Sequence, residues 1–558
     1  MAVDVTKELL LSVRKPARYI GGEIGSVRKD LSKVDVKVCL CFPDTYEIGM
    51  SHLGMRVLYD VLNKQSDCAA ERVFSPWVDM EEKLKESGIP LFSLESKIPV
   101  RDFDCLGFSL QYELSYTNVL NILSLSGIPL RSDERGADDP LVIAGGACAL
   151  NPEPMADFID LFCVGEAEDC LLEIIAEIKA YKRSGARDRA ELLKRLSLLE
   201  GVYAPLCRLP VGKKISKRFV MDLDRVLDFK HWVVPFIEIV HDRLTIEIMR
   251  GCPNSCRFCQ ARCSFYPVRI ISAEKILETA RRLYRLTGYD EISLLSLSSS
   301  DHPDLKEIIT ELSKEFKDKG VSISLPSLRA KIYIGEMSKI FASTRKTSLT
   351  FAPEAGTDRL RRIIGKDLSI DELFSVAGES FAAGYRLLKL YFMIGLPTET
   401  DEDLDAIVSM ARDLSRLKKE INGHPAQLNI SISSFIPKPH THFQRCAMEP
   451  MEALVKKQEY LKNLFRKCKG TIHPSYHDVY SSFLEGVFAR GDRKLGSVVL
   501  KAFQKGARFD SWNNMFNFSI WKEAFLSAGI DPGEYLRARR DDEPLPWDFI
   551  DLGSRDKA

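Results

Sequence analysis

Short apolar runs alternate with amphipathic stretches through the first 200 residues. The apolar runs cover residues 36–42, 105–110, 141–144 and 161–164, and the amphipathic stretches cover 53–62, 118–125 and 171–181. Continuous apolar runs of this length are typical of parallel strands that are buried on both faces, and the stretches between them are typical of crossover helices. The pattern predicts an α/β fold in residues 1–200, with a doubly wound, Rossmann-like parallel sheet.

The alternation starts again at residue 244. Strand-like runs lie at 244–249, 292–297, 321–325, 348–351, 387–392 and 428–435, with helical stretches between them, for example 273–286, 305–316 and 404–417. Six strand–helix repeats predict an incomplete (β/α)6 TIM barrel over residues 237–447. In a parallel barrel the chemistry lies at the carboxyl ends of the strands.

Two regions lack this alternation. Residues 201–236 contain several prolines and little periodicity, which predicts a connector. Residues 448–558 predict a small, mainly helical C-terminal domain, whose aromatic side chains, such as Phe503, Trp512 and Trp521, are expected to form its core.

Composition narrows the class of protein. The 558 residues are 45% hydrophobic and 28% charged, as in a globular protein, and the 79 basic and 79 acidic residues give a formal net charge of +0. This balance argues against a nucleic-acid surface that spans the chain. No apolar run has the length of a membrane span, and the N-terminus lacks a signal-peptide pattern, so we expect a cytoplasmic protein with reduced thiols and no membrane partner.

Three cysteines follow the apolar run at 244–249 with the spacing Cys-x₃-Cys-x₂-Cys. They are Cys252, Cys256 and Cys259. A structural zinc ion takes four ligands, commonly from two separated Cys pairs, and the chain has no second pair. An iron–sulfur cube held by three thiolates keeps one iron open, although spacing alone leaves a zinc site as an alternative. Cys263 would close that iron if it bound the same cluster, and we interpret it as a non-ligand.

Several strand-end runs carry a more specific pattern. They read Ser-Leu-Ser-Ser-Ser-Asp at 296–301, Leu-Pro-Ser-Leu-Arg at 325–329, Leu-Thr-Phe-Ala-Pro-Glu-Ala-Gly at 349–356, Leu-Tyr-Phe-Met-Ile-Gly-Leu-Pro-Thr-Glu at 390–399 and Phe-Ile-Pro-Lys-Pro-His-Thr at 435–441. With the cysteines, they resemble the radical S-adenosylmethionine (SAM) superfamily. Upstream runs at 46–54, 145–146, 151–154 and 165–166 resemble the cobalamin-binding-type domain of a largely uncharacterised branch, and methylthiotransferases are more distant relatives. The resemblance covers nearly the whole chain.

The resemblance implies a 4Fe–4S cluster on Cys252, Cys256 and Cys259 whose open iron chelates SAM. An electron donor such as flavodoxin or ferredoxin would reduce the cluster, and cleavage of SAM would yield a 5′-deoxyadenosyl radical. The expected contacts are Ser298, Ser299 and Ser300 with the methionyl amino group, Arg329 with its carboxylate, Glu354 with the ribose, Gly395 and Ile436 with the adenine, Phe258 beside the cluster and Lys389 pointing into the barrel. An interstrand ion pair explains Arg329 equally well.

The loop after the first strand differs from the cobalamin pattern. Family domains that replace the lower cobalt ligand carry Asp-x-His-x-x-Gly, and here the loop reads Asp44-Thr-Tyr46-Glu-Ile-Gly49. A neutral phenol is a poor cobalt ligand, so the resemblance implies cobalamin without a histidine ligand. Asp44, Tyr46, Gly49, Gly145 and Gly146 are the expected contacts. The alternative is a domain that now binds substrate.

Three functions follow from these observations. The first is cobalamin-assisted methylation of an unactivated carbon by a radical SAM enzyme. The second is a cobalamin-independent radical enzyme that thiolates or rearranges RNA or protein. The third is a non-catalytic binding module with a structural metal. The sequence does not identify the substrate, and RNA or protein are the classes considered.

Overall fold

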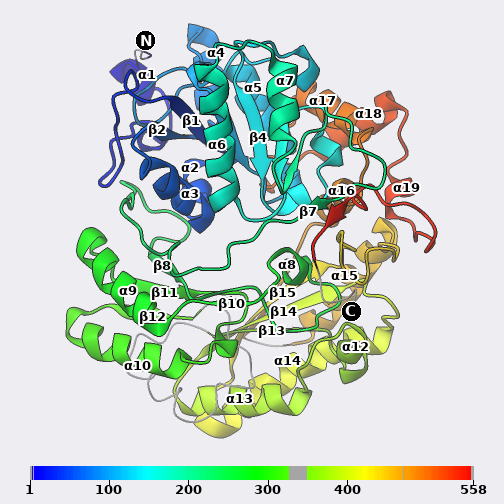
Figure 1. Cartoon of the computed structure of the whole chain (residues 1–558). Coiled ribbons are helices and arrows are strands. Elements are labelled where there is room, and N and C mark those ends of the chain that lie inside the picture. The colour runs from blue at the N-terminus through cyan, green and yellow to red at the C-terminus, as the bar shows by residue number, and fades with distance from the viewer. Residues whose placement is uncertain (1–2, 4, 326–348, 469–470, 554–558) are drawn as a thin grey trace. The chain divides into compact units, whose positions relative to one another are not determined.

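In the computed structural model, which describes residues 3, 5–325, 349–468 and 471–553, the chain divides into two units (Figure 1). The first comprises Met1–Asp242, Phe488–Pro532 and Pro544–Ala558, and the second comprises Arg243–Val487 and Gly533–Glu543. No helix within the described ranges has the length and hydrophobicity to cross a membrane.

The first unit contains the predicted doubly wound sheet. Its strand order is β2-β1-β3-β4-β5-β6, in which β6 alone is antiparallel to its neighbour. The strands are β1 (Val36–Phe42), β2 (Cys68–Phe74), β3 (Cys105–Ser109), β4 (Leu141–Gly145), β5 (Leu161–Cys163) and β6 (Val202–Tyr203), and its main helices are α3 (Leu53–Asn63), α4 (Val78–Ser87), α5 (Tyr116–Leu125), α6 (Ala167–Arg183) and α7 (Arg189–Leu196). The four strands expected from apolar runs are confirmed as β1, β3, β4 and β5.

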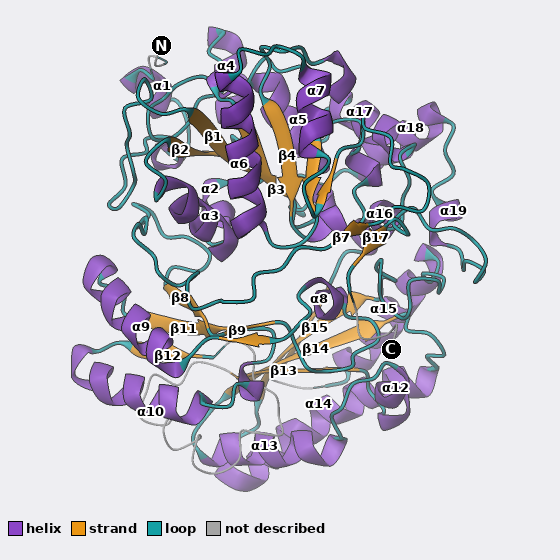
Figure 2. Ribbon diagram, in the orientation of Figure 1, coloured by secondary structure: helices purple, strands orange, loops and turns teal. Residues whose placement is uncertain are grey.

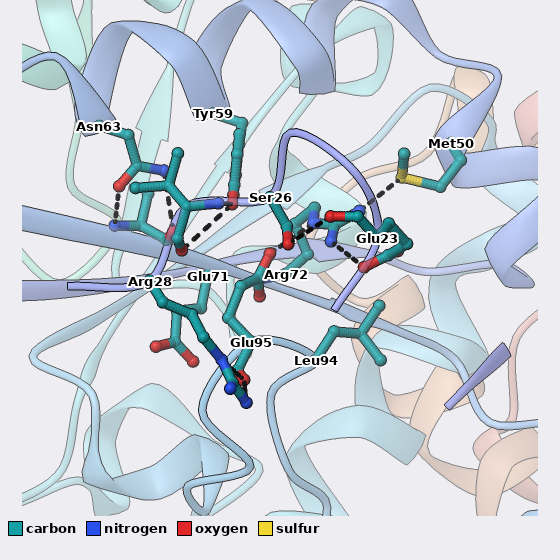
Figure 3. Close-up of polar contacts among 12 residues, drawn as sticks. Glu23, Ser26, Arg28, Met50, Tyr59, Asn63, Glu71, Arg72, Leu94 and Glu95 are labelled. Atoms are coloured by element: carbon teal, nitrogen blue, oxygen red, sulfur yellow. Dashed lines mark hydrogen bonds and ion pairs between the residues drawn. The ribbon is translucent and has the colours of Figure 1, made fainter. Parts of the chain in front are cut away.

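Strand β2 was not expected from the sequence, because Glu71 and Arg72 interrupt its apolar residues. Both charged side chains are nevertheless buried. The Arg72 guanidinium lies 2.9 Å from Glu23 and 2.6 Å from Glu95 (Figure 3). It also lies over the ring of Tyr59 at 5.3 Å. Neighbouring carboxylates therefore allow a charged residue in a strand that the hydrophobic pattern alone would reject.

The chain after residue 447 does not form the separate C-terminal domain that we expected. Helices α17 (Leu495–Gln504) and α18 (Phe518–Ala528) belong to the first unit, as do the connector residues 201–236. The Phe488 ring contacts Tyr116 of α5 at 5.6 Å and Trp521 of α18 at 5.2 Å. The aromatic residues of this region thus complete the core of the N-terminal unit instead of forming a core of their own.

The second unit contains two parallel sheets. One has the order β12-β11-β8 and the other β13-β14-β15-β16. The strands are β8 (Leu244–Glu247), β11 (Glu291–Leu295), β12 (Ser322–Ser324), β13 (Leu349–Glu354), β14 (Leu387–Ile394), β15 (Gln427–Ser434) and β16 (Ile472–Tyr476), and the main helices are α9 (Ala273–Thr287), α10 (Leu305–Phe316), α13 (Ile370–Ala382), α14 (Asp401–Asn422) and α15 (Met451–Arg466). The six expected strands are confirmed, and β16 is an additional strand within the region expected to be helical.

Candidate functional site

The cysteine loop follows β8 and the short strand β9 (Met249–Arg250). Cys259 precedes the five-residue helix α8 (Gln260–Ser264). The three motif cysteines are partly exposed, whereas Cys263 is buried, and its thiol donates a hydrogen bond to the His440 carbonyl at 3.2 Å. This contact supports the interpretation of Cys263 as a non-ligand, which stays a prediction.

Asn254 connects the cysteine loop to the loop after β11. Its side-chain amide nitrogen donates to the Cys252 Sγ atom at 3.1 Å and to the Asp301 carboxylate at 3.2 Å. The Ser298 hydroxyl donates to the same Asp301 carboxylate at 2.6 Å. An amide NH₂ has two donors, so Asn254 can make both contacts at once. The spacing of the cysteines does not single out Asn254, since this residue occupies an unspecified position of the motif.

Two other segments contact the cysteine loop through the backbone, one at the end of helix α12 (Asp358–Ile363) and one after β15. The Arg257 amide donates to the Ile364 carbonyl at 2.8 Å, and the His442 amide donates to the Arg257 carbonyl at 3.2 Å. At Gly365, where φ is 69°, a Cβ atom would lie 2.6 Å from the Ser255 carbonyl oxygen. The loop after β11 and the segments that follow α12 and β15 therefore fix the backbone that carries the cysteines.

Glu354 ends β13 with φ of 68°, a conformation that is uncommon outside glycine. Its carboxylate lies 3.5 Å from the Lys366 ammonium. Burial raises the pKa of Glu354, and Lys366 opposes that rise. Burial likewise raises the pKa of the Cys256 thiol, and Lys366 again opposes the rise. Lys366 is therefore a charged neighbour of both groups that sequence spacing did not indicate.

The thiols must lose their protons to bind metal. Burial raises the pKa of Cys259 as well as that of Cys256, so both are protonated without metal at neutral pH. A single zinc ion would need its sulfurs about 4 Å apart. Among the described side chains, no three of His, Cys, Asp or Glu converge closely enough to hold one ion.

The other described residues expected to contact SAM, apart from Phe258 in the cysteine loop, lie within strands or shortly after their carboxyl ends. Ser298, Ser299 and Ser300 are buried around a 3₁₀ turn that follows β11. Phe258 packs against an apolar cluster that includes Leu360 and Phe435. The other expected residues are Lys389 within β14, Gly395 directly after β14, Ile436 shortly after β15 and Arg329, which lies outside the described residues.

The residues expected to contact cobalamin are engaged with the protein itself. The Asp44 carboxylate accepts hydrogen bonds from Trp512 Nε1 at 2.9 Å and from Ser511 Oγ at 3.2 Å. The Tyr46 hydroxyl, in a side chain that is 2% exposed, donates to Glu23 at 2.9 Å. The cavity beside Tyr46 measures ≈ 20 Å³, room for about one water molecule.

The three glycines expected near cobalamin are also closely packed or paired. A Cβ atom on Gly49 would lie 2.3 Å from the Phe74 ring, and one on Gly146 would lie 2.6 Å from the Leu110 carbonyl. Gly145 pairs with Ser109 and Cys163 in the sheet. Downstream, Asn151 donates to the carbonyls of Ala489 and Gly491 at 3.0 and 2.9 Å. Contacts within the first unit therefore account for the glycines at these three positions.

Comparisons with known proteins agree with this architecture. A family model described as "Radical SAM proteins, N-terminal" matches residues 54–205, and the "Radical SAM superfamily" model matches residues 246–411. The uncharacterized protein MJ0966 of Methanocaldococcus jannaschii is 29% identical over 510 residues, covering 88% of this chain and 100% of its own length.

Two solved structures are similar in fold. The radical SAM methyltransferase TsrM from Kitasatospora setae, with cobalamin and a [4Fe–4S] cluster bound, has a TM-score of 0.51 at 14% identity, covering 71% of this chain and 72% of its own. The cobalamin-dependent SAM radical enzyme OxsB, with aqua-cobalamin and SAM bound, has a TM-score of 0.51 at 16% identity. The similarity covers 94% of this chain and 77% of the OxsB chain. With the family matches on both halves and the cysteine loop at the carboxyl ends of its strands, this chain belongs to the radical SAM superfamily.

Proposed function

We propose that this protein is an enzyme that reductively cleaves SAM to a 5′-deoxyadenosyl radical, which removes a hydrogen atom from an unactivated carbon of the substrate. The observation that carries the proposal is the cysteine loop. Cys252, Cys256 and Cys259 remain partly exposed, while the buried Cys263 thiol is committed to a backbone carbonyl.

The residues around the loop fit a 4Fe–4S cluster with an open iron. When bound, the reduced cluster supplies one electron to the sulfonium of SAM, which then releases methionine and the radical. Cys252, Cys256 and Cys259 would hold three irons. Asn254 donates a hydrogen bond to one ligand sulfur, and Lys366 places a positive charge near another. Ser298 and Asp301 provide oxygen acceptors suited to an ammonium group.

Cobalamin-assisted methylation is the finer reaction that the similarity to TsrM and OxsB favours, because both structures contain cobalamin. A cobalamin held by Asp44 or Tyr46 does not fit the contacts of those side chains, since both already bond to protein groups. Other residues would have to hold it. The alternative is a radical enzyme without cobalamin that acts on RNA or protein.

The test is anaerobic reconstitution of the full chain with iron and sulfide, followed by reduction with dithionite in the presence of SAM. We expect 5′-deoxyadenosine and methionine in equal amounts, and their absence from a protein that contains the cluster would contradict the proposal. Cys252→Ala, Cys256→Ala and Cys259→Ala should each abolish the product, whereas Cys263→Ala is the matched control that should retain it.

Cobalamin binding is tested separately, by adding hydroxocobalamin during reconstitution and measuring the amount that the protein retains after gel filtration. Stoichiometric retention with formation of methylcobalamin would support methylation. A protein that forms 5′-deoxyadenosine but retains no cobalamin would support the cobalamin-independent enzyme.

A further inference from the structure

The sheet β13-β14-β15-β16 has one apolar face and one polar face. On the apolar face, Leu388, Leu390, Leu428 and Ile430 are at most 1% exposed. Helices α13 and α14 run along one side of these strands (Figure 2). Because side chains alternate along a strand, the residues between these leucines and isoleucines lie on the opposite face.

The parallel register places the polar residues of this opposite face in rows. Thr350, Lys389, Asn429 and His473 are consecutive partners across the four strands. Tyr391, Ser431 and Ser475 form the next row toward the carboxyl ends. Neighbouring strands lie roughly 4.8 Å apart, so each row is a continuous line of side chains.

This polarity is unusual for the sheet type. Parallel sheets are normally covered on both faces by apolar residues, and the interior of a closed barrel is filled by branched aliphatic side chains. Here Tyr391 is 45% exposed. Within the part of the chain that the structure describes, Lys389, Asn429 and His473 make no side-chain hydrogen bond or ion pair. A row of unpaired polar groups on a face that could have been apolar indicates a ligand-binding surface.

The charged and polar groups on this face indicate the chemical class of the ligand. Lys389 supplies a cationic group, and Glu354, the one carboxylate in the four strands, is ion-paired with Lys366. A lysine ammonium binds phosphate as a point charge, an amide such as that of Asn429 both donates and accepts, and an exposed tyrosine ring offers a stacking surface for a base.

We propose that this face, defined by Thr350, Lys389, Tyr391, Asn429, Ser431 and His473, binds the substrate, and that the substrate is a nucleotide unit, either free or within RNA. The inference rests on the proposed function, because it assigns a substrate class to the same barrel. Lys389 would contact the phosphate, Tyr391 would stack on the base and Asn429 would bond to its edge.

The test measures binding directly, with the full-length, cluster-reconstituted protein saturated with SAM so that the adenosyl site is filled. The probes are the four nucleoside 5′-monophosphates, the matching nucleosides and a fluorescein-labelled single-stranded RNA of mixed sequence. We expect a monophosphate or the RNA to bind. Lys389→Met should weaken this binding about tenfold without affecting the nucleosides, and Tyr391→Leu should weaken both. Binding of monophosphates would identify a free nucleotide, and binding of RNA alone would identify RNA.

Two controls separate the ligand contacts from general damage. Tyr480, 44% exposed on α16 (Val479–Ala489), matches Tyr391 in exposure, so Tyr480→Leu should bind like the parent protein. Asn429→Asp preserves the shape of the side chain and adds a negative charge, so it should weaken phosphate binding even if Lys389→Met fails to fold.

The proposal would be overturned if no probe bound, if the face variants bound like the parent, if only an acidic peptide bound, or if Lys389→Met lost SAM binding alone. Formation of 5′-deoxyadenosine is measured in parallel. A protein that cleaves SAM but binds no nucleotide would retain the proposed function and lose the substrate assignment.

Discussion

At the scale of single residues, Asn254 is the side chain that most directly tunes the cysteine loop. A hydrogen bond to a ligand sulfur stabilises the more negative, reduced state of a cluster. We therefore expect Asn254→Ala to lower the midpoint potential by roughly 40 mV, which corresponds to about 1 kcal/mol for one electron. An EPR-monitored redox titration measures this shift. Ser298→Ala keeps the contact with sulfur and should shift the potential less, and equal potentials in all three proteins would exclude this role for Asn254.

Arg72 is the residue whose loss should cost the most stability in the N-terminal unit. Its removal leaves the carboxylates of Glu23 and Glu95 buried without their cation (Figure 3). Arg72→Met should lower the free energy of unfolding by about 3–5 kcal/mol. Arg183, whose side chain is 71% exposed in its ion pair with Asp35, is the control, and Arg183→Met should cost less than about 1 kcal/mol. Urea titration compares them, and similar losses would contradict the prediction.

Individual residues were predictable only where a spacing rule names them. Cys252, Cys256 and Cys259 follow from such a rule, whereas Asn254 and Lys366 do not, because their importance depends on which loops the fold brings together. Tyr46 illustrates the opposite case. The sequence placed it at a ligand position, but its hydroxyl bonds to Glu23, which lies 23 residues earlier in the chain.

At the scale of secondary-structure elements, apolar runs predicted strands well and missed those that contain polar residues. Strand β2 was not predicted because Glu71 and Arg72 interrupt its apolar run, and the residues that bind these two side chains lie far from them in the sequence. Strand β16, Ile-His-Pro-Ser-Tyr, contains a proline, and its two polar residues, His473 and Ser475, lie on the polar face of the sheet. Tertiary context decides such strands, and hydrophobic periodicity does not contain that context.

The segment before α18 carries a pH-dependent contact. The buried Asp510 carboxylate accepts hydrogen bonds from Thr117 of α5 at 2.7 Å and from Trp521 of α18 at 2.8 Å, and burial raises its pKa from 3.8 to about 6. The folded state therefore holds this proton more tightly than the unfolded state. Its contribution to stability is fully present below about pH 4 and is lost as the pH rises through 6.

Asp510→Asn should remove this dependence. The whole loss in the parent protein amounts to about 3 kcal/mol, of which about 2 kcal/mol falls between pH 4.5 and pH 7.5. The free energy of unfolding of the variant, minus that of the parent, should therefore be larger at pH 7.5 than at pH 4.5. Urea unfolding of the full chain at both pH values measures this difference. A difference between the two proteins that does not change with pH would show that Asp510 keeps an ordinary pKa.

At the scale of the whole molecule, the C-terminal part of the chain contributes to both units. Residues 488–532 and 544–558 belong with the N-terminal sheet, and 533–543 belong with the barrel. A fragment that ends at residue 487 would leave the α5 surface around Tyr116 without the aromatic residues that cover it. We expect such a fragment to aggregate, and co-expression with residues 488–558 to restore solubility. A soluble fragment with cooperative unfolding would contradict this dependence.

The central claim is that three thiolates hold a 4Fe–4S cluster whose fourth iron binds SAM. The most direct measurement is the EPR spectrum of the dithionite-reduced, reconstituted protein with and without SAM carrying ¹⁷O in its carboxylate. We predict that SAM changes the g values of the cluster and that ¹⁷O broadens the signal, in the parent protein and in Cys263→Ala alike. A spectrum that SAM leaves unchanged, or a cluster that is lost in Cys263→Ala, would contradict the claim.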